Sequence, residues 1–592
     1  MYNYSSESRY KEEQLDPFGF CTILKYGGNI HAMAYYLNDR RIKIDKRLLD
    51  YDFPPAPLKP EKLYDTEPQQ QIPVPTHPTQ TLAAALKEEV TVTHKTETNT
   101  TGRINQHSDA RYADVTECQQ DYNSGLSIGY YWDMYSMNNT SYMVQFPKKE
   151  HIITIAPTGS GKNTAVQVPA ILEYEESMLI IDPKGECAAI TAKARKAKGH
   201  VFIVNPFNVL APHFEDIGFK DFHGFNPLAA FHDFSDPNFV ADISALSEAL
   251  VMRPEGTADS YWADSARDLI SCLIMYVCIE YPKERHLPKV RKLLSLSGEE
   301  FDLVIGDISE HAFTPMSNKA SRFLTTTGNN SNASVISTAL TATAFIDDPQ
   351  LSDNLQQEDF KFSDMQNKVV TIYLILPAKF LLAYSSWFRL LITSCLDQLM
   401  LVDEKPKVST LIMLDEFPLL GQLSAIEKAV GLSRGYGIQL WMFIQDIHQL
   451  NALYGKRAES FLSNTGMQQY FTPNDIETAE RISKRIGETT VAQTKQTIDV
   501  GQMSGATLKE LEYSNKSFPL LYPIEVIGLD QELQIVFFSG HQNSVVMSKN
   551  HYYKSSEYTS VTTRNPYYET KSPLQSGLLI MSNSHDSKKG IE

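Results

Sequence analysis

The sequence has few cysteines, and their spacing excludes a disulfide framework or a zinc–cysteine cluster. Only six occur among 592 residues, and no two of them form a Cys-x-x-Cys pair. Free thiols spread along a chain in this way are typical of proteins from a reducing compartment. The six are Cys21, Cys118, Cys187, Cys272, Cys278 and Cys395.

Long apolar runs are missing as well. A membrane-spanning helix needs about 20 consecutive apolar residues, whereas the longest run, residues 269–279, is closed by Asp268 and Glu280. The N-terminus also lacks the basic segment followed by an apolar one that marks a secretory signal. These absences predict a cytosolic chain without a transmembrane helix, in which residues 269–279 belong to the core of a helical region.

Positive charge is in deficit, since the formal net charge is -17 and the isoelectric point is near 5.4. This balance excludes a protein whose whole surface is covered by nucleic acid. It still permits DNA in a locally basic channel, because charges act over a screening length of about 8 Å. Basic clusters at 193–198, 283–292 and 481–485 are candidates for such a path, although most clusters of this kind are solvated faces.

Composition divides the chain into segments. Its length predicts two or more domains, and 42% hydrophobic residues are typical of a globular protein. Residues 1–52 form an N-terminal segment of mixed character. Residues 53–104 are rich in Pro, Thr and Gln and poor in large apolar side chains, which predicts a disordered linker. Residues 555–592 are rich in Ser, Thr, Asn and Lys, which predicts a mobile tail.

Between these ends, the pattern predicts an α/β fold with a mainly parallel sheet. Short apolar runs recur with strand length and are rich in Ile, Leu and Val, as in strands covered on both faces. They lie at 151–156, 178–182, 201–205, 369–376, 410–415 and 439–445. Residues 227–346 contain helix-period segments such as 262–276 and no convincing strand. We therefore expect an inserted all-α domain, which divides the α/β domain into parts at 105–226 and 347–554.

A glycine-rich segment after the first of these strands is typical of a phosphate-binding loop. Its glycines let successive backbone N–H groups point at phosphate oxygens, at the start of a helix. The lysine is expected to reach the β- and γ-phosphates of a nucleotide. The motif is imperfect, because Ala156 replaces the first glycine and Asn163 replaces the Ser or Thr that normally binds magnesium. The expected binding residues are Gly159, Ser160, Gly161, Lys162, Asn163 and Thr164.

Two acidic residues follow the strand at 410–415, where ligands bind in open α/β sheets. Asp415 is expected to hold Mg²⁺, and Glu416 to orient or deprotonate the attacking water. Either motif occurs by chance, but the two together, each in its proper strand context, predict a P-loop ATPase with ATP and Mg²⁺ as its cofactors.

An ordered set of further motifs resembles the TraG/TraD-type coupling ATPases of conjugation and type IV secretion. The resemblance runs from about residue 107 to 553. The motifs are His107-Ser108-Asp109-Ala110-Arg111-Tyr112-Ala113, the loop at 156–162, Asp182-Pro183-Lys184-Gly185-Glu186, Phe225-Asn226-Pro227-Leu228, Leu414-Asp415-Glu416-Phe417-Pro418, Arg434-Gly435-Tyr436-Gly437, Gln445-Asp446 and Asn474-Asp475, near Thr478 and Ser483.

The resemblance implies a RecA-like P-loop NTPase core with the all-α insertion, assembled as a homohexamer around a central channel. It implies that Arg434 reaches the γ-phosphate held by a neighbouring subunit and that Gln445 is a polar sensor. It also implies partners: single-stranded DNA in a relaxase complex or effector proteins, and type IV secretion components of the inner membrane. Asp182 and Glu186 are expected at the same nucleotide face, and Lys184 either touches phosphate or solvates the loop.

One departure from the family concerns the membrane. Members usually begin with membrane-spanning helices, and this chain shows none. Either a partner supplies the anchor or the ring docks peripherally on the secretion machinery, so we expect a peripheral location on the cytoplasmic face of the bacterial inner membrane. The first 104 residues are where a contact with the secretion machinery could lie.

Three functions remain open from the sequence. The first is a motor that recruits DNA or protein substrates and drives them toward the secretion channel by ATP hydrolysis. The second is a substrate receptor or adaptor with little ATP turnover. The third is an FtsK/HerA-like DNA pump outside secretion. The inserted helical domain and the segment at 182–186 argue against it, whereas the absence of a membrane-spanning helix is consistent with it.

Overall fold

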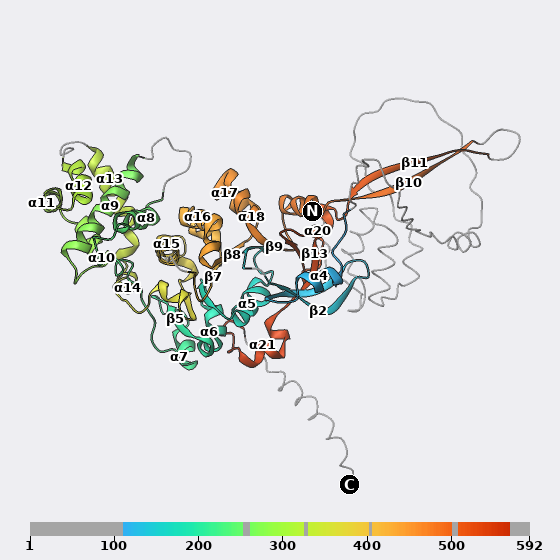
Figure 1. Cartoon of the computed structure of the whole chain (residues 1–592), viewed down its shortest axis with the longest axis horizontal. Coiled ribbons are helices and arrows are strands. Elements are labelled where there is room, and N and C mark those ends of the chain that lie inside the picture. Colours follow the sequence, from blue (N-terminus) through green and yellow to red (C-terminus); the bar gives the residue numbers. More distant parts are fainter. Residues whose placement is uncertain are drawn as a thin grey trace, which may run out of the picture. The chain divides into compact units, whose positions relative to one another are not determined.

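The computed structural model describes residues 110–568, apart from residue 148 and the segments 253–260, 325–329, 402–404 and 500–506 (Figure 1). The chain divides into two compact units, residues 1–103 and 104–592, and all described residues belong to the second. The expected N-terminal segment at 1–52 and the expected linker at 53–104 lie outside the described residues.

Seven neighbouring parallel strands form one side of an eleven-stranded sheet, up to its edge strand β5. Each of the strands expected from the sequence is present, and β9 is an addition. The α/β fold with a mainly parallel sheet is thereby confirmed. In spatial order the seven are β9 (Thr465–Phe471), β3 (His151–Ile155), β8 (Ile438–Ile444), β7 (Thr410–Leu414), β4 (Ser177–Ile181), β6 (Val370–Leu374) and β5 (His200–Val204).

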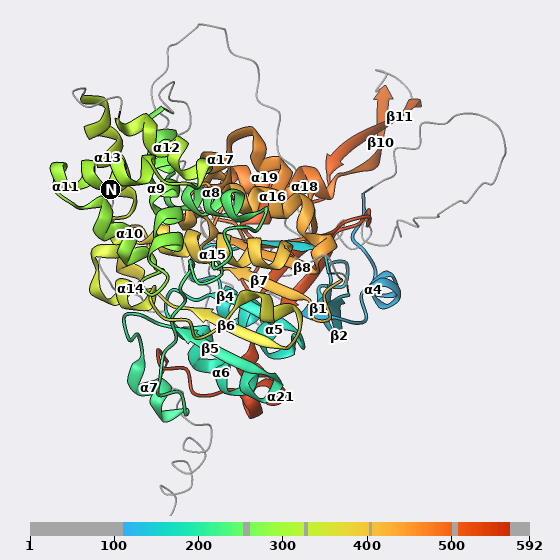
Figure 2. The same cartoon turned by 60° about the vertical axis from the view of Figure 1, so that its left-hand side comes forward.

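Strands β3, β8, β7, β4 and β6 are buried on both faces, which explains their mostly apolar sequences. In β4, Met178 and Ile180 join one hydrophobic cluster with residues of α5 (Val168–Glu173) and α6 (Glu186–Lys198). Leu179 and Ile181 join the other cluster, with residues of α15 (Ser385–Met400) and α16 (Ser424–Leu432). Successive side chains of a strand point to opposite faces, so helices cover both sides of the sheet (Figure 2).

Four strands extend the sheet beyond β9 in antiparallel fashion, and the sequence analysis did not predict them. They are β12 (Leu533–Phe538), β13 (Val545–Lys549), β1 (Leu126–Asp133) and β2 (Asn138–Phe146). Because β12 is antiparallel to both β9 and β13, β13 runs in the same direction as β3. Its carboxyl end therefore lies at the same edge of the sheet as the end of β3.

The described chain between β5 and β6 contains helices and no strand. Its helix α9 contributes a continuous buried stretch that includes Leu269, Ile270, Leu273 and Ile274, each 0% exposed. Among the described residues, no helix is long and apolar enough to cross a membrane. The α-helices of this region are α7 (Ala211–Asp216), α8 (Phe239–Leu250), α9 (Tyr261–Glu280), α10 (Leu287–Leu294), α11 (Gly298–Ser309), α12 (Thr314–Leu324), α13 (Asn330–Ala342) and α14 (Pro349–Asn354).

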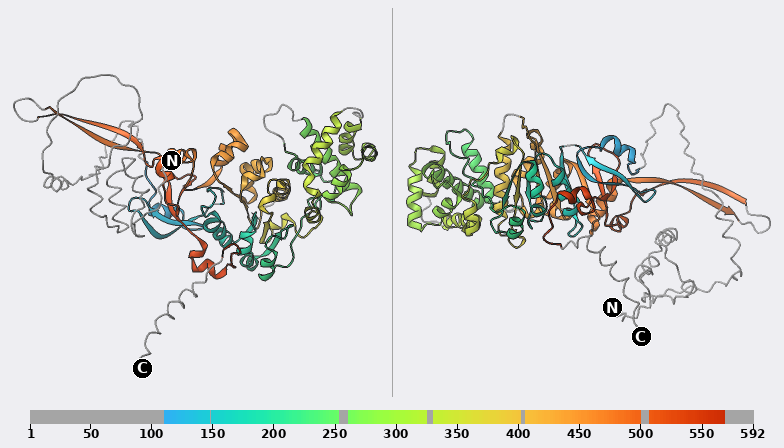
Figure 3. Two further views of the ribbon diagram at one scale, coloured as in Figure 1. Left: turned by 180° about the vertical axis from the view of Figure 1, so that it is seen from behind. Right: turned by 90° about the horizontal axis from the view of Figure 1, so that it is seen from below.

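Two other helical stretches lie after β8 in the chain. Between β8 and β9 run α17 (Ile447–Tyr454) and α18 (Ala458–Ser463), and β9 is followed by α19 (Ile476–Ile486). Strands β10 (Glu488–Asp499) and β11 (Thr507–Pro519) then pair with each other as a separate two-stranded sheet (Figure 3). The short helix α20 (Pro523–Ile527) leads back into β12.

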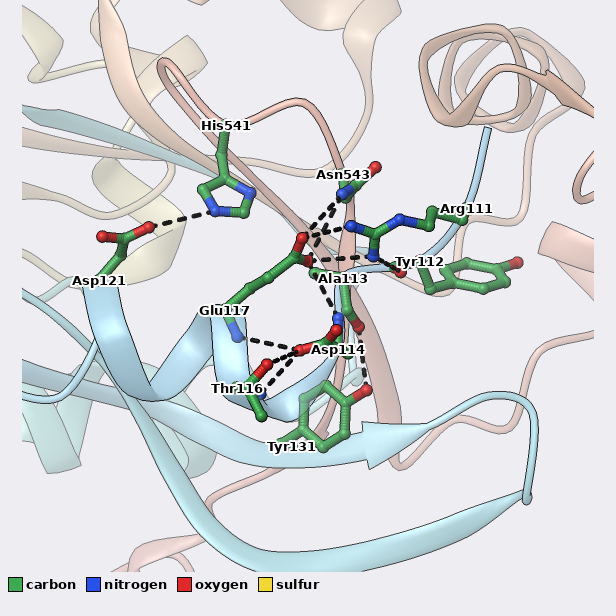
Figure 4. Close-up of polar contacts among 10 residues, drawn as sticks. All are labelled: Arg111, Tyr112, Ala113, Asp114, Thr116, Glu117, Asp121, Tyr131, His541 and Asn543. Atoms are coloured by element: carbon green, nitrogen blue, oxygen red, sulfur yellow. Dashed lines mark hydrogen bonds and ion pairs between the residues drawn. The ribbon is translucent and has the colours of Figure 1, made fainter. Parts of the chain in front are cut away.

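The start of the described chain is fastened to the turn between β12 and β13 (Figure 4). Arg111 donates to the carboxylate of Glu117 in α4 (Val115–Asp121), at 2.5 Å, and Asn543 donates to the same carboxylate at 3.3 Å. Asp114 caps α4 by accepting from two backbone N–H groups. The backbone N–H of Ala113 donates to the carbonyl of Ser544 at 2.9 Å.

Residues 555–568 are packed onto the fold, whereas the sequence predicted a mobile tail from residue 555. They contain α21 (Ser556–Val561). The hydroxyl of Tyr558 donates to the carboxylate of Glu173, and the backbone N–H of Thr563 donates to the carbonyl of Ile190 at 3.0 Å. The prediction failed because side chains of this polar segment, such as Tyr558 and Asn565, are buried against the fold. Residues 569–592 lie outside the described part of the chain.

Candidate nucleotide-binding site

The loop after β3 has the backbone conformation that a phosphate cradle requires. Gly159 and Gly161 have φ angles of +79° and +89°, in the left-handed region that side chains with a Cβ rarely adopt. A Cβ at Gly161 would also lie 3.1 Å from the ring of His551. The loop runs directly into a π-helical turn, η2 (Asn163–Gln167), and then into α5. Such turns are frequent at functional sites.

Lys162 is held between two carboxylates that directly follow β7, the second strand from β3 in the sheet. Its Nζ atom lies 2.8 Å from Oδ1 of Asp415 and 2.5 Å from Oε1 of Glu416. Burial opposes the charged form of Lys162, but the two carboxylates outweigh it and raise its pKa. The ammonium group is therefore charged and fixed in place beside the loop.

The two acids differ in their electrostatics, which suits two different roles. Burial raises the pKa of Asp415 even though Lys162 opposes the shift. Burial also disfavours the charged form of Glu416, but Lys162 and a hydrogen bond from Gln445 outweigh it and lower its pKa. Glu416 has a φ angle of +50°, which is uncommon for a residue with a side chain and is characteristic of functional sites.

Gln445 completes the acidic side of the site. It follows β8, and its Nε2 atom donates to Oε2 of Glu416 at 3.0 Å. Strands β7, β8 and β3 are neighbours, so their carboxyl ends bring Glu416, Gln445 and Lys162 together. The structure thus places the expected sensor residue in direct contact with the expected catalytic carboxylate.

Asn163 and Thr164 contact other groups. The amide of Asn163 donates to Oε2 of Glu186 at 3.0 Å. The hydroxyl of Thr164 donates to the carbonyl of Gly161 at 3.1 Å and lies 2.9 Å from Nδ1 of His551. Among the loop and strand-end residues, the carboxylate of Asp415 is the oxygen donor best suited to Mg²⁺, which prefers hard oxygen ligands.

The segment after β4 borders the same edge of the sheet. Asp182 is buried, and burial raises its pKa to about 7, with Asp415 and Glu186 adding to the shift. One of its carboxylate oxygens accepts from the backbone N–H of Ala188 at 2.7 Å. Glu186 accepts a second hydrogen bond from Asn565 at 2.7 Å. These acids belong to the packing around the loop.

Arg434 lies away from the loop of its own chain. It sits in the short helix η7 (Ser433–Tyr436), which precedes β8, and therefore at the amino ends of the strands. Its Nη2 atom lies 2.7 Å from Oε1 of Glu150, the residue before β3, and its side chain is 55% exposed. The nucleotide loop is at the opposite end of β3, so Arg434 cannot serve this loop within one subunit.

The sequence analysis missed a group of residues that contact the loop and its surroundings from β13 and the segment after it. Lys549 at the end of β13 donates to the carbonyl of Ser160 at 2.8 Å, and His551 contacts Gly161 and Thr164. Asn565 binds Glu186 as described above. These residues carry no recognisable motif, because their role depends on β13 returning to the sheet between β12 and β1.

The basic clusters make contacts within the fold. In 193–198, Arg195 is fully buried. In 283–292, Arg291 pairs with Asp347 at 2.5 Å. In 481–485, Arg481 pairs with Glu459 at 2.7 Å, and Arg485 lies over the ring of Phe537. A good part of each cluster is therefore occupied by structural contacts.

Comparison with known proteins identifies the family. The family described as "Type IV secretory system Conjugative DNA transfer" matches residues 90–576. The chain belongs to this family. Individual proteins also match directly. The type IV secretion system-coupling protein VirD4 of Bartonella quintana is 28% identical over 428 residues, which are 70% of this chain and 65% of that protein. The conjugal transfer protein TraG of Escherichia coli is 26% identical over 430 residues, 69% of this chain and 65% of that protein.

The matches to these curated coupling proteins span about 65% of the relatives' own length. Among solved structures, an unbound form of the bacterial conjugative coupling protein TrwB superposes with a TM-score of 0.56 at 15% identity, covering 74% of this chain and 92% of that one. This likeness confirms the RecA-like P-loop NTPase fold of the coupling-protein core. The resemblance to TraG/TraD-type proteins is likewise confirmed.

Proposed function

We propose that this coupling protein hydrolyses ATP and uses the energy to pass substrates to a type IV secretion channel. The observation that carries the proposal is the constellation of Lys162, Asp415, Glu416 and Gln445 at adjoining strand ends, in a chain of this family. Related TrwB structures are described as complexes with a non-hydrolysable ATP analogue, a GTP analogue, and ADP with Mg²⁺. The residues found here are of the kind that such ligands require.

The roles of the residues follow from their positions. The N–H groups of the loop and the ammonium of Lys162 bind the phosphates, and Asp415 provides a carboxylate for Mg²⁺, which when bound neutralises phosphate charge. Glu416 accepts a proton from, or orients, the attacking water. Gln445 holds the side chain of Glu416 by its hydrogen bond, and so fixes the direction in which the second oxygen points.

The assembly and the partners belong to the same proposal. We infer a homohexamer in which Arg434 acts on the site of a neighbouring subunit, because it lies at the far end of the strands from its own loop. We infer that the substrates are single-stranded DNA in a relaxase complex or effector proteins, and that the ring lies peripherally at the cytoplasmic face of the inner membrane, beside other secretion components.

The test is steady-state ATP hydrolysis by the purified full chain, with and without single-stranded DNA. Lys162→Ala should reduce turnover at least a hundredfold, because the phosphates lose the cation beside the loop. Lys368→Ala is the control, since Lys368 is 46% exposed and lies outside the three basic clusters considered as a DNA path. Native protein that binds ATP but does not hydrolyse it, with or without DNA, would contradict the motor and support a receptor or adaptor.

The nature of the substrate calls for a second measurement. Glu416→Gln should retain nucleotide binding and lose hydrolysis, so the variant accumulates in its ATP-bound form. Material that co-purifies with this variant from cells carrying the secretion system, compared with the Lys162→Ala variant, distinguishes DNA from protein cargo. Cargo on neither variant would contradict recruitment by this chain.

A further inference from the structure

The positions of the charged residues indicate how a bound nucleotide would run along the edge of the sheet. Lys162 turns toward Asp415 and Glu416, which follow β7, and Gln445 follows β8. Both strands lie on one side of β3 in the sheet order. Since Lys162 and these acids act on the γ-phosphate end, the nucleoside end must leave the loop on the other side of β3. The strands on that side are β9, β12 and β13.

The residues after β13 stand at that position. The Nδ1 atom of His551 lies 2.9 Å from the hydroxyl of Thr164, and the same ring limits the space at Gly161. Lys549 fixes the segment by donating to the carbonyl of Ser160 while its ammonium lies 3.8 Å from the ring centroid of Phe471. Both His551 and Lys549 are 5% exposed, so these two side chains are held in place by packing and form a buried wall beside the loop.

Tyr553 lies next to His551 and adds an exposed aromatic ring to this side of the loop. Its ring stacks on that of His551, with centroids 5.1 Å apart and planes at 29°. The residue is nevertheless 50% exposed. A half-exposed tyrosine that is held by a buried histidine, and is adjacent to a phosphate loop, offers the flat apolar surface on which a nucleobase stacks.

We propose that Tyr553, supported by His551, forms the base-binding platform of the nucleotide site. The proposal rests on the proposed ATP binding and adds the subsite for the nucleoside. Stacking uses the π-face that every base has, so the platform contributes affinity and discriminates little between adenine and guanine. The phosphates are bound by the loop whether or not a base is attached.

Binding measurements separate the contribution of the nucleoside from that of the phosphates. Each probe is titrated into the full chain in the presence of Mg²⁺, and binding is followed by isothermal titration calorimetry. The probes are a β,γ-imido analogue of ATP and inorganic tripolyphosphate, which has the phosphates without a nucleoside. Tyr553→Ala should weaken the ATP analogue about tenfold, equivalent to about 1.4 kcal/mol, and leave tripolyphosphate unchanged. Tyr553→Phe should retain the native affinity. The control is Tyr135→Ala, because Tyr135 is 69% exposed in the turn between β1 and β2.

Photolabelling locates the base directly. With 8-azido-ATP, the label should fall on the tryptic peptide of residues 550–554, which contains Tyr553, and Tyr553→Ala should reduce this labelling. The platform is overturned if Tyr553→Ala leaves the affinity for the ATP analogue within twofold of native, if it weakens tripolyphosphate equally, or if the label falls elsewhere. Native protein that binds neither probe would instead overturn the proposed ATP binding, and the platform with it.

Discussion

At the scale of single residues, the site is organised by charges that hold one another in place. Lys162 is fixed by Asp415 and Glu416, and Glu416 is fixed in turn by Gln445. Removing one partner of such a group leaves the others buried without compensation, which costs more than a surface pair. Asp182, which follows β4 at the same edge of the sheet, differs from Asp415 and Glu416 because no cation is among the groups that shift its pKa.

Asp182 predicts a pH-dependent stability. Its pKa is about 7 in the folded protein and about 3.9 in an unfolded chain, so the folded state binds the extra proton between these values. The contribution of Asp182 to folding therefore falls as pH rises from about 4 to about 7, and the full penalty remains above pH 7. Asp182→Asn removes the penalty and keeps an oxygen for the N–H of Ala188.

We expect the melting temperature of nucleotide-free Asp182→Asn to exceed that of the native chain by about 2–5 °C at pH 8, and by about a third of that difference at pH 5, where only part of the penalty is present. Thermal melts at intervals of one pH unit measure this difference. Asp302→Asn, at an exposed position of α11, is the matched control. An advantage that is constant across the range would show that Asp182 does not titrate there.

At the scale of elements, one buried arginine of α6 hydrogen-bonds to the end of α5 and to β6. Arg195 is 0% exposed and donates to the carbonyls of Tyr174 and Glu176, which follow α5, and to the hydroxyl of Thr371 in β6. Carbonyls at the end of a helix have no partner within the helix. One side chain therefore joins the end of α5, the helix after the phosphate loop, to α6 and the sheet.

Arg195→Met should lower the free energy of unfolding by about 2–4 kcal/mol, because the buried carbonyls lose their donor while a methionine fills most of the space. Chemical denaturation followed by circular dichroism measures the loss. For comparison, Arg322→Met removes a side chain that is 56% exposed and paired with Asp268, and should cost less than about 1 kcal/mol. Equal losses in the two variants would contradict the structural role of Arg195.

At the scale of the whole molecule, the expected catalytic groups of one chain do not meet at a single site. The nucleotide loop lies at the carboxyl ends of the strands, and Arg434 lies at the amino ends, paired with Glu150. An arginine that is 55% exposed at this position is accessible to a second copy of the chain. This geometry supports the proposed action across a subunit interface.

Mixing two inactive variants tests that action. Arg434→Ala keeps an intact loop, and Lys162→Ala keeps an intact arginine, so a mixed ring contains some interfaces with both. Activity of the mixture should rise to a fraction of the native value, whereas each variant alone stays inactive. Hydrolysis is measured across mixing ratios, with mixed assembly verified by two affinity tags. If verified mixed rings never regain activity, Arg434 does not act in trans.

The sequence by itself predicted six of the seven strands of the parallel core and the family, and it missed β9. Apolar runs such as 178–182 and 439–445 are recognisable locally, because a strand buried on both faces is apolar at most of its positions. The loop residues around Lys162 and the pair Asp415 and Glu416 were predictable for a related reason. Phosphate and metal binding demand particular residue types at fixed positions after a strand.

Only the tertiary structure decided what surrounds the loop. That Gln445 contacts Glu416, that Arg434 faces away from its own loop, and that Lys549 and His551 form a wall beside Ser160 and Thr164 all depend on the order of strands in the sheet. Contacts between residues hundreds of positions apart leave no local pattern. Residues 555–568 show the same limit: their polar composition predicted a mobile tail, yet they are ordered by packing against the surfaces of α5 and α6, which exist only once the sheet has formed.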